Sequence, residues 1–173
     1  MKRWLIVLSV LIVFLTGGCN NKSPADDNND KLSSEKLAEI NRQLLIKESE
    51  RISSYIKRKD LEMRETGTGL WVSDNITVSK GEIKQGDIVE LEYTCSLLDG
   101  TLIYDSSADG TMSFEVGKSD KPAGLEEGVK LMREGAEGII IVPEYLGYGL
   151  LGDKKKIPAR STLVYKIKII AVK

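Results

Sequence analysis

Apolar and polar residues alternate with a helical period in the first half of the chain. From Ser33 to about Lys59, apolar residues recur every three or four positions, with charged residues between them. The apolar positions are Leu37, Ile40, Leu44, Ile52, Tyr55 and Ile56. This spacing predicts an amphipathic helix about 40 Å long at 1.5 Å per residue. We expect its apolar face to pack on the following domain or on a second copy of the chain, in preference to an unrelated protein.

After Gly67 the period changes from helical spacing to strict alternation. Between Ile88 and Leu98, apolar side chains alternate with polar ones, which predicts a half-buried antiparallel strand. The Asp99-Gly100 pair that follows predicts a tight turn. Further strands are predicted at residues 102–104, 112–116, 138–142 and 161–172.

One short helix is predicted among these strands. It runs from Leu125 to Arg133, with its apolar side chains on one face, between Pro122 and Gly135, which are typical of helix boundaries. An antiparallel sheet curled around one short helix is an α+β fold. The pattern therefore predicts an α+β domain at residues 67–173, preceded by a long amphipathic helix and linker at residues 33–66.

The N-terminus has the pattern of an export signal. A basic start and an uncharged apolar run precede Gly17-Gly18 and Cys19, and the run is shorter than the roughly 20 apolar residues of a membrane-spanning helix. We expect residues 1–18 to be a lipoprotein signal peptide and Cys19 to be lipidated. If the cysteine were incidental, the product would still leave the cytoplasm. Residues 20–30 hold no large apolar side chain, so residues 19–32 are predicted to be a disordered tether.

Composition excludes several classes of function. The 25 basic and 26 acidic residues nearly cancel, which argues against a nucleic-acid partner. The chain has no histidine, so Ser-His-Asp or Cys-His catalysis and histidine-ligated metals are excluded. With Cys19 predicted to carry lipid, Cys95 is a lone thiol on an alternating strand, where a small hydrophobic role is the usual one.

Seven short motifs follow one another in the second half of the chain. They are Glu92-Tyr93-Thr94, Asp99-Gly100, Tyr104-Asp105-Ser106-Ser107, Phe114-Glu115-Val116-Gly117, Gly124-Leu125-Glu126-Glu127-Gly128, Pro143-Glu144-Tyr145-Leu146-Gly147-Tyr148-Gly149 and Ile157-Pro158-Ala159-Arg160-Ser161-Thr162-Leu163-Val164-Tyr165. In this order and spacing they resemble the FK506-binding, or FKBP-type, family of peptidyl-prolyl cis/trans isomerases. Tyr55-Ile56-Lys57-Arg58, followed by Glu65-Thr66-Gly67-Thr68-Gly69-Leu70, further resembles the segment before the domain in lipoprotein members from Bacteroidetes, including gliding-motility-associated isomerases.

The resemblance implies a hydrophobic cavity between helix and sheet, with no cofactor and no metal. The positions that match its substrate-binding lining are Tyr93, Tyr104, Phe114, Leu125, Ile157 and Tyr165. Asp105 and Tyr148 match the polar edge, where Tyr148 would offer its hydroxyl to the substrate carbonyl and Asp105 would order the edge; we take them as the candidate catalytic residues. On the residues alone, Phe114, Leu125 and Ile157 fit a packed core better than a site. A carboxylate and a phenol have less reason to be buried without a polar task.

Three positions depart from the family pattern. Leu125 stands where well-known members have tryptophan at the cavity floor, and the flexible Met112 replaces a wall aromatic. Pro122 aligns with a residue whose backbone N–H donates to bound ligand in the family, and proline has no N–H to donate. We therefore predict weakened macrolide binding.

The function that follows is isomerisation of X-Pro bonds in exported polypeptides that fold slowly. The alternatives are a client-binding chaperone with weak or vestigial catalysis, or a docking subunit of an envelope complex. The expected location is the cell envelope, lipid-anchored through Cys19. Asn20 after that cysteine favours the outer membrane. A homodimer through residues 33–59 is the expected form of self-association.

Overall fold

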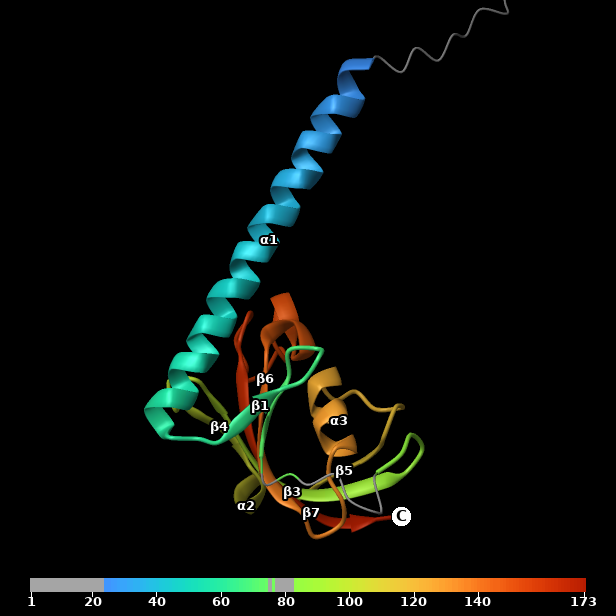
Figure 1. Ribbon diagram of the computed structural model, residues 1–173. Coiled ribbons are helices and arrows are strands. Elements are labelled where there is room, and N and C mark those ends of the chain that lie inside the picture. The colour runs from blue at the N-terminus through green and yellow to red at the C-terminus, as the bar shows by residue number, and fades with distance from the viewer. Residues whose placement is uncertain (1–23, 75, 77–82) are drawn as a thin grey trace, which may run out of the picture. The chain divides into compact units, whose positions relative to one another are not determined.

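The structure is a computed structural model that describes residues 24–74, 76 and 83–173 (Figure 1). The predicted signal peptide at residues 1–18, the predicted lipid site Cys19 and the first residues of the predicted tether lie outside the described residues. The chain divides into two compact units, Met1–Gln43 and Leu44–Lys173. The second unit contains all of the strands in the described part of the chain.

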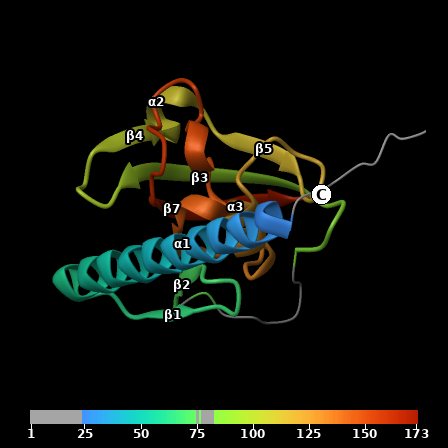
Figure 2. The same ribbon diagram turned by 90° about the horizontal axis from the view of Figure 1, so that it is seen from above.

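The described strands of the second unit form one antiparallel sheet in the order β1-β2-β6-β7-β3-β4, with β5 also paired to β3. The strands are β1 Met63–Glu65, β2 Trp71–Ser73, β3 Ile88–Leu97, β4 Leu102–Asp105, β5 Met112–Glu115, β6 Glu137–Val142 and β7 Leu163–Val172. The long strands β3 and β7 pair along their whole length in the middle of the sheet, and Figure 2 shows β4 and β5 on one side of them and β1 and β2 on the other. Because β5 pairs with the first half of β3 and β4 with the second half, the two short strands follow one another along the same edge.

Alternate residues of the central strands face opposite sides of this sheet, as period-two strands require. On β6, Ile140 packs in the main core with Leu125 of α3 (Ala123–Lys130). Its neighbour Ile141 packs instead with Ile52 and Tyr55 of α1 (Pro24–Lys59). Figure 1 shows α3 and the C-terminal part of α1 on the two sides of the sheet.

Helix α1 changes character along its length. Leu37 and Ile40 are 58% and 47% exposed, whereas Ile52 is 1% exposed under the domain. The predicted amphipathic helix is therefore present, and the last part of its apolar face packs on its own domain. The helix also includes residues 24–32, which their polar composition predicts to be part of a disordered tether; Pro24 stands at the first helical position, where proline is favoured.

The predicted α+β fold is confirmed, with a curled antiparallel sheet around α3 and a helix before the domain. Each predicted strand is present with ends shifted by no more than a few residues. The three-residue strands β1 and β2 lie where the pattern predicts none. Three short helical segments also accompany α3, namely α2 Ser106–Asp109, η1 Glu144–Leu146 and η2 Gly149–Leu151.

Candidate functional site

A cavity of about 290 Å³ opens where four strands meet two loops. Its lining residues are Tyr93, Tyr104, Met112, Asp120, Lys121, Tyr148, Asp153, Lys155 and Tyr165. The strands β3, β4, β5 and β7 supply the three buried or half-buried tyrosines and the methionine. The charged residues come from the loop before α3 and from the loop between β6 and β7, which also carries Tyr148.

One edge of the cavity is built around Asp153. The Tyr104 hydroxyl donates a hydrogen bond to its Oδ2 atom, and the backbone N–H groups of Lys155 and Ile157 both donate to its Oδ1 atom at 2.8 Å. Partial burial acts to raise the pKa of the Asp153 carboxyl, but these hydrogen bonds outweigh burial and hold that pKa below its ordinary value. Asp153 is therefore a fixed anion that orients Tyr104 and the loop.

The same edge carries a cation. The Nζ atom of Lys156 lies 4.8 Å from the centre of the Tyr104 ring, within the range of a cation–π interaction. Burial, followed by the hydrogen bond and charge of Asp153, raises the pKa of Tyr104. The ring is thus held between a carboxylate at its hydroxyl and an ammonium near its face.

Tyr148 is positioned to donate a hydrogen bond into the cavity. It is half-buried between η1 and η2 and has no hydroxyl partner among the described side chains that would compete with a substrate. Burial, reinforced by the nearby charge of Asp153, raises the pKa of its phenol to about 12. At neutral pH Tyr148 is therefore protonated and able to donate to a substrate carbonyl.

The floor of the cavity is inert. Tyr165 is 2% exposed, and burial raises the pKa of its phenol well above the ordinary value. Cys95 lies beside it in the core, and burial raises the pKa of its thiol to about 11. A thiol with so high a pKa forms little thiolate at neutral pH, which matches the expected role of Cys95 as a small hydrophobic residue.

The candidate site residues lie in three settings, which are the cavity lining, the main core and, for Asp105, the N-terminus of α2. Tyr93, Tyr104, Tyr148 and Tyr165 line the cavity together. Phe114, Leu125 and Ile157 are 7%, 0% and 4% exposed and lie in the main core, as the residue-based interpretation favours. Pro122 is also buried, and its carbonyl oxygen accepts hydrogen bonds from the first turn of α3.

Asp105 has a structural role at the N-terminus of α2. Its carboxylate caps the N-terminus of α2 by accepting a hydrogen bond from the Ser107 backbone N–H at 2.8 Å. Hydrogen bonds from the Ser107 backbone and hydroxyl lower the pKa of Asp105, so it is ionised at neutral pH. Asp105 is the residue after Tyr104 in β4. Tyr104 lines the cavity, whereas Asp105 is not among the lining residues.

Sequence reasoning missed three charged residues of the lining, Asp120, Lys121 and Asp153. All three lie in loops, where no periodicity marks which side chains point inward. The segment Lys154-Lys155-Lys156, between the motifs that carry Tyr148 and Ile157, was expected to border the cavity mouth, and Lys155 lines the cavity. Lys121 is paired with Asp120 at 2.9 Å, so the cavity mouth contains both signs of charge.

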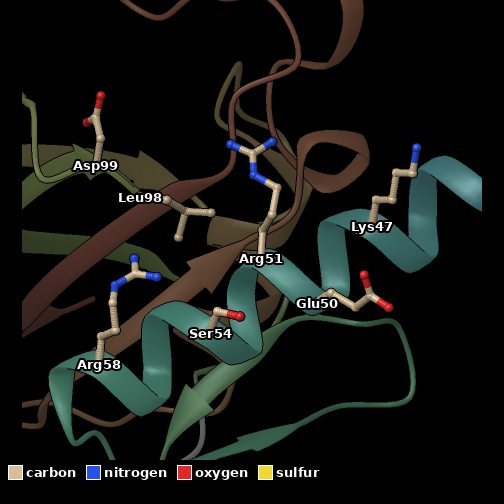
Figure 3. A pocket seen from close by; sticks show the side chains of 7 residues that line it. All are labelled: Lys47, Glu50, Arg51, Ser54, Arg58, Leu98 and Asp99. Carbon is tan, nitrogen blue, oxygen red and sulfur yellow. The ribbon is translucent and has the colours of Figure 1, made fainter.

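A wider cavity of about 600 Å³ lies between α1 and the turn after β3. Figure 3 shows Arg51, Ser54 and Arg58 on the face of the helix that points toward Leu98, with Asp99 on the opposite wall. No aromatic side chain lines it, so it lacks the apolar surface that would hold a proline ring. The smaller aromatic cavity is therefore the candidate active site.

Two searches concern metal sites and membrane spans in the part of the chain that the structure describes. Within residues 24–74, 76 and 83–173, no group of histidine, cysteine and carboxylate side chains is arranged to hold a metal ion. A search of the described helices finds none with the length and apolar character of a membrane span.

Comparison with known proteins finds one family that the chain resembles. A family model described as FKBP-type peptidyl-prolyl cis-trans isomerase matches residues 79–170. FK506-binding protein 2 of Dictyostelium discoideum is 37% identical over 91 residues, which cover 51% of this chain and 68% of the relative. The probable FKBP-type peptidyl-prolyl cis-trans isomerase FkpA of Neisseria meningitidis serogroup B is 37% identical over 97 residues, covering 54% of this chain and only 35% of the relative.

A solved structure agrees on the fold. The crystal structure of FkpA from Escherichia coli superposes with a TM-score of 0.63 at 24% identity, covering 86% of this chain and 70% of that one. The two sequence matches each cover about half of this chain. The sequence similarity therefore concerns mainly the isomerase domain, where the family model matches residues 79–170.

Proposed function

The chain belongs to the family of FKBP-type peptidyl-prolyl cis-trans isomerases, and on that premise we propose that it catalyses rotation about X-Pro bonds in exported polypeptides of the cell envelope. The observation that carries the proposal is the aromatic cavity, in which Tyr93, Tyr104 and Tyr165 surround a space of about 290 Å³ next to Tyr148. This volume accommodates a proline ring with the amide that precedes it.

Such a cavity can catalyse rotation without covalent chemistry. The X-Pro amide has a barrier of about 18–20 kcal/mol because its C–N bond has partial double-bond character, and uncatalysed exchange takes tens of seconds or longer. A site accelerates rotation if it binds the twisted amide more tightly than either planar isomer. Aromatic walls remove water from the amide carbonyl, which disfavours the polar planar form.

The polar edge of the cavity then fixes the orientation of the bound X-Pro peptide. The Tyr148 hydroxyl donates to a backbone carbonyl of the substrate and fixes its position relative to the proline ring. Asp153 and Asp105 act indirectly, since the first orients Tyr104 and the second caps the short helix that follows β4. No metal, cofactor or acid–base step is needed.

The N-terminal pattern supports a lipid-anchored enzyme in the envelope. In this proposal residues 1–18 are removed as a signal peptide, Cys19 carries the lipid, and the outer membrane is the preferred location because Asn20 follows that cysteine. The resemblance expected from the sequence between residues 55–58 and 65–70 and Bacteroidetes lipoprotein members is in keeping with the same location. Loss of lipid labelling and of membrane association in Cys19→Ala is the expected result.

A client-binding chaperone is the second candidate function. It is favoured by the apolar side chains that α1 leaves exposed, Leu37 and Ile40 among them, and by the Met112 and Pro122 departures at the cavity. In this alternative the helix grasps unfolded clients or pairs with a second copy, and catalysis is weak. Suppression of client aggregation without acceleration of X-Pro exchange distinguishes it from the first proposal.

The deciding experiment is NMR exchange of a series of short X-Pro peptides with the soluble chain, residues 20–173. We expect acceleration by the wild type, a clear loss in Tyr148→Phe, and a loss in Asp105→Val. Tyr145→Phe is the matched control, because the Tyr145 hydroxyl donates to the Thr68 carbonyl outside the cavity. If the folded wild type accelerates exchange in none of the peptides, the catalytic proposal is wrong and the client-binding chaperone becomes the favoured function.

A further inference from the structure

One carboxylate oxygen of α1 holds both ends of the loop that builds the polar edge of the cavity. The Oε1 atom of Glu48 accepts a hydrogen bond from the Glu144 backbone N–H at 2.6 Å. The same atom accepts a hydrogen bond from the Thr162 hydroxyl at 2.7 Å. Residues 144–162, the segment between these two contacts, contain Tyr148, Asp153 and Lys155 of the cavity lining.

The local chain explains why a side chain is needed at this point. The β6–β7 ladder ends at the Val142 and Leu163 pair, and Pro143 follows Val142 without an N–H to extend it. The Glu144 N–H lies beyond the ladder, and Thr162 is 5% exposed. Without Glu48 the buried Thr162 hydroxyl and the half-buried Glu144 N–H would each lose this hydrogen-bond partner, which is unfavourable, most of all for the buried hydroxyl.

Glu48 reaches this position because of its place on the helix. It precedes Ile52 and Tyr55 by four and seven residues, so it lies on the helix face that packs against the sheet. The side chain is partly buried there. Docking of the helix and closure of the loop base therefore occur together.

We propose that Glu48 is a positioning residue for the isomerase site: through the Glu144 N–H and the Thr162 hydroxyl, it fixes the loop that presents Tyr148 and Asp153. The inference rests on the proposed catalytic function of the cavity. It assigns to α1 a role in catalysis that is separate from tethering, because a helix that is undocked releases the base of the loop. Small displacements of a positioning group are sufficient to lower a rate strongly.

The test compares four proteins in the X-Pro exchange assay well below their melting temperatures. The variants are Glu48→Ala, Glu48→Gln and Glu50→Ala, against the wild type. Glu48→Ala is expected to lower kcat/KM about tenfold, whereas Glu48→Gln keeps a side-chain oxygen acceptor and should remain close to the wild type. Glu50 is the matched control, since it lies on the same helix, lines the wide cavity in Figure 3 and has no hydrogen-bond partner among the described residues.

Amide hydrogen exchange provides a readout that does not depend on turnover. In Glu48→Ala the Glu144 N–H should exchange faster, together with the Gly147 N–H of the next turn, while amides in the middle of β3 and β7 keep their protection. A purely structural role predicts a lower melting temperature with unchanged kcat/KM. That result, or faster exchange at Glu144 with wild-type kcat/KM, would overturn the proposal.

Two further measurements keep the outcomes separate. If Glu48→Ala fails to fold, Thr162→Val removes one of the two hydrogen bonds and should lower kcat/KM by a smaller factor; unchanged kcat/KM then contradicts the inference. If the wild type itself shows no turnover, the proposed function fails, and the positioning role is judged from the Kd of an X-Pro peptide. Equal Kd values for the wild type and Glu48→Ala would then reject it.

Discussion

At the scale of single residues, Tyr148 and Asp153 keep fixed charges around neutral pH. The pKa of Tyr148 is raised to about 12, that of Asp153 is lowered, and the chain has no histidine. None of these groups changes protonation between pH 5 and pH 9. We expect kcat/KM for an X-Pro peptide to be flat over that range; a bell-shaped profile with an inflection near pH 7 would contradict the assignment.

The buried Cys95 and the half-buried Tyr148 predict an alkaline limit to stability. Burial raises the pKa of Cys95 from 9.0 to about 11 and that of Tyr148 from 10.0 to about 12. The folded state keeps these protons at pH values where the unfolded state loses them, so stability is fully present below about pH 9 and falls as pH rises toward 12. Cys95 lowers the free energy of unfolding by up to about 1.4 kcal/mol per pH unit within its window, and the half-buried Tyr148 contributes less because solvent screens its charge. Urea unfolding at pH 8, 10 and 11 measures the decline. In Cys95→Ala the free energy of unfolding should start to fall at a higher pH than in the wild type.

Replacement of Pro122 should tighten the binding of FK506. The family resemblance predicts that Pro122 occupies the position that donates a backbone N–H to bound ligand, and its φ of −55° is accessible to alanine. Pro122→Ala restores the N–H in an unchanged backbone, and one added hydrogen bond of about 0.5–1.5 kcal/mol corresponds to roughly 2- to 10-fold tighter FK506 binding. Calorimetry on both proteins measures the ratio. Equal Kd values, or a wild type that binds as tightly as ordinary family members, would contradict this explanation.

At the scale of elements, the close contact between α3 and β6 requires a glycine at position 128, which has no side chain. An alanine normally favours a helix interior over glycine by about 1 kcal/mol. At Gly128, however, an added Cβ would lie 2.3 Å from Cδ1 and 3.0 Å from Cγ2 of Ile140, which is fully buried. We expect Gly128→Ala to destabilise the domain by about 1–3 kcal/mol in urea unfolding, as overpacked cores do.

The control for this prediction is the partner residue. Ile140→Val removes the Cδ1 atom that the new Cβ would meet, so the two changes together should cost less than the sum of their separate effects. Additive free energies of unfolding in the double variant would show that the helix moves freely over β6.

What the sequence predicts at this scale depends on the length of the element. The strands containing Leu91 and Ile167 are long enough for period-two alternation to show, and both were predicted together with the helix that contains Val129. The strands β1 and β2 have three residues each, too few for a period. Lys121 and Asp153 reach the cavity from loops, because tertiary contacts rather than local pattern decide where loop side chains point.

At the scale of the whole molecule, the central question is how much of α1 belongs to the isomerase domain. The second compact unit begins at Leu44, and Ile52 is 1% exposed in a cluster with Ile141 and Val164. Ile52→Ala should therefore lower the free energy of unfolding by about 2–5 kcal/mol, as for other buried large-to-small changes. Urea unfolding of the soluble chain, residues 20–173, measures the loss.

Ile40→Ala is the matched comparison, because it removes the same atoms from the same helix at a residue that is 47% exposed. In a monomer this change should alter stability by less than about 0.5 kcal/mol. In the proposed homodimer the exposed apolar face is covered by a second copy, so Ile40→Ala should weaken self-association in sedimentation equilibrium without changing unfolding at high dilution. A concentration-independent monomer that is equally stable with Ile40 or Ala would reject the dimer. It would leave the exposed face available to clients, and the chaperone candidate would then need testing on that face rather than in the cavity.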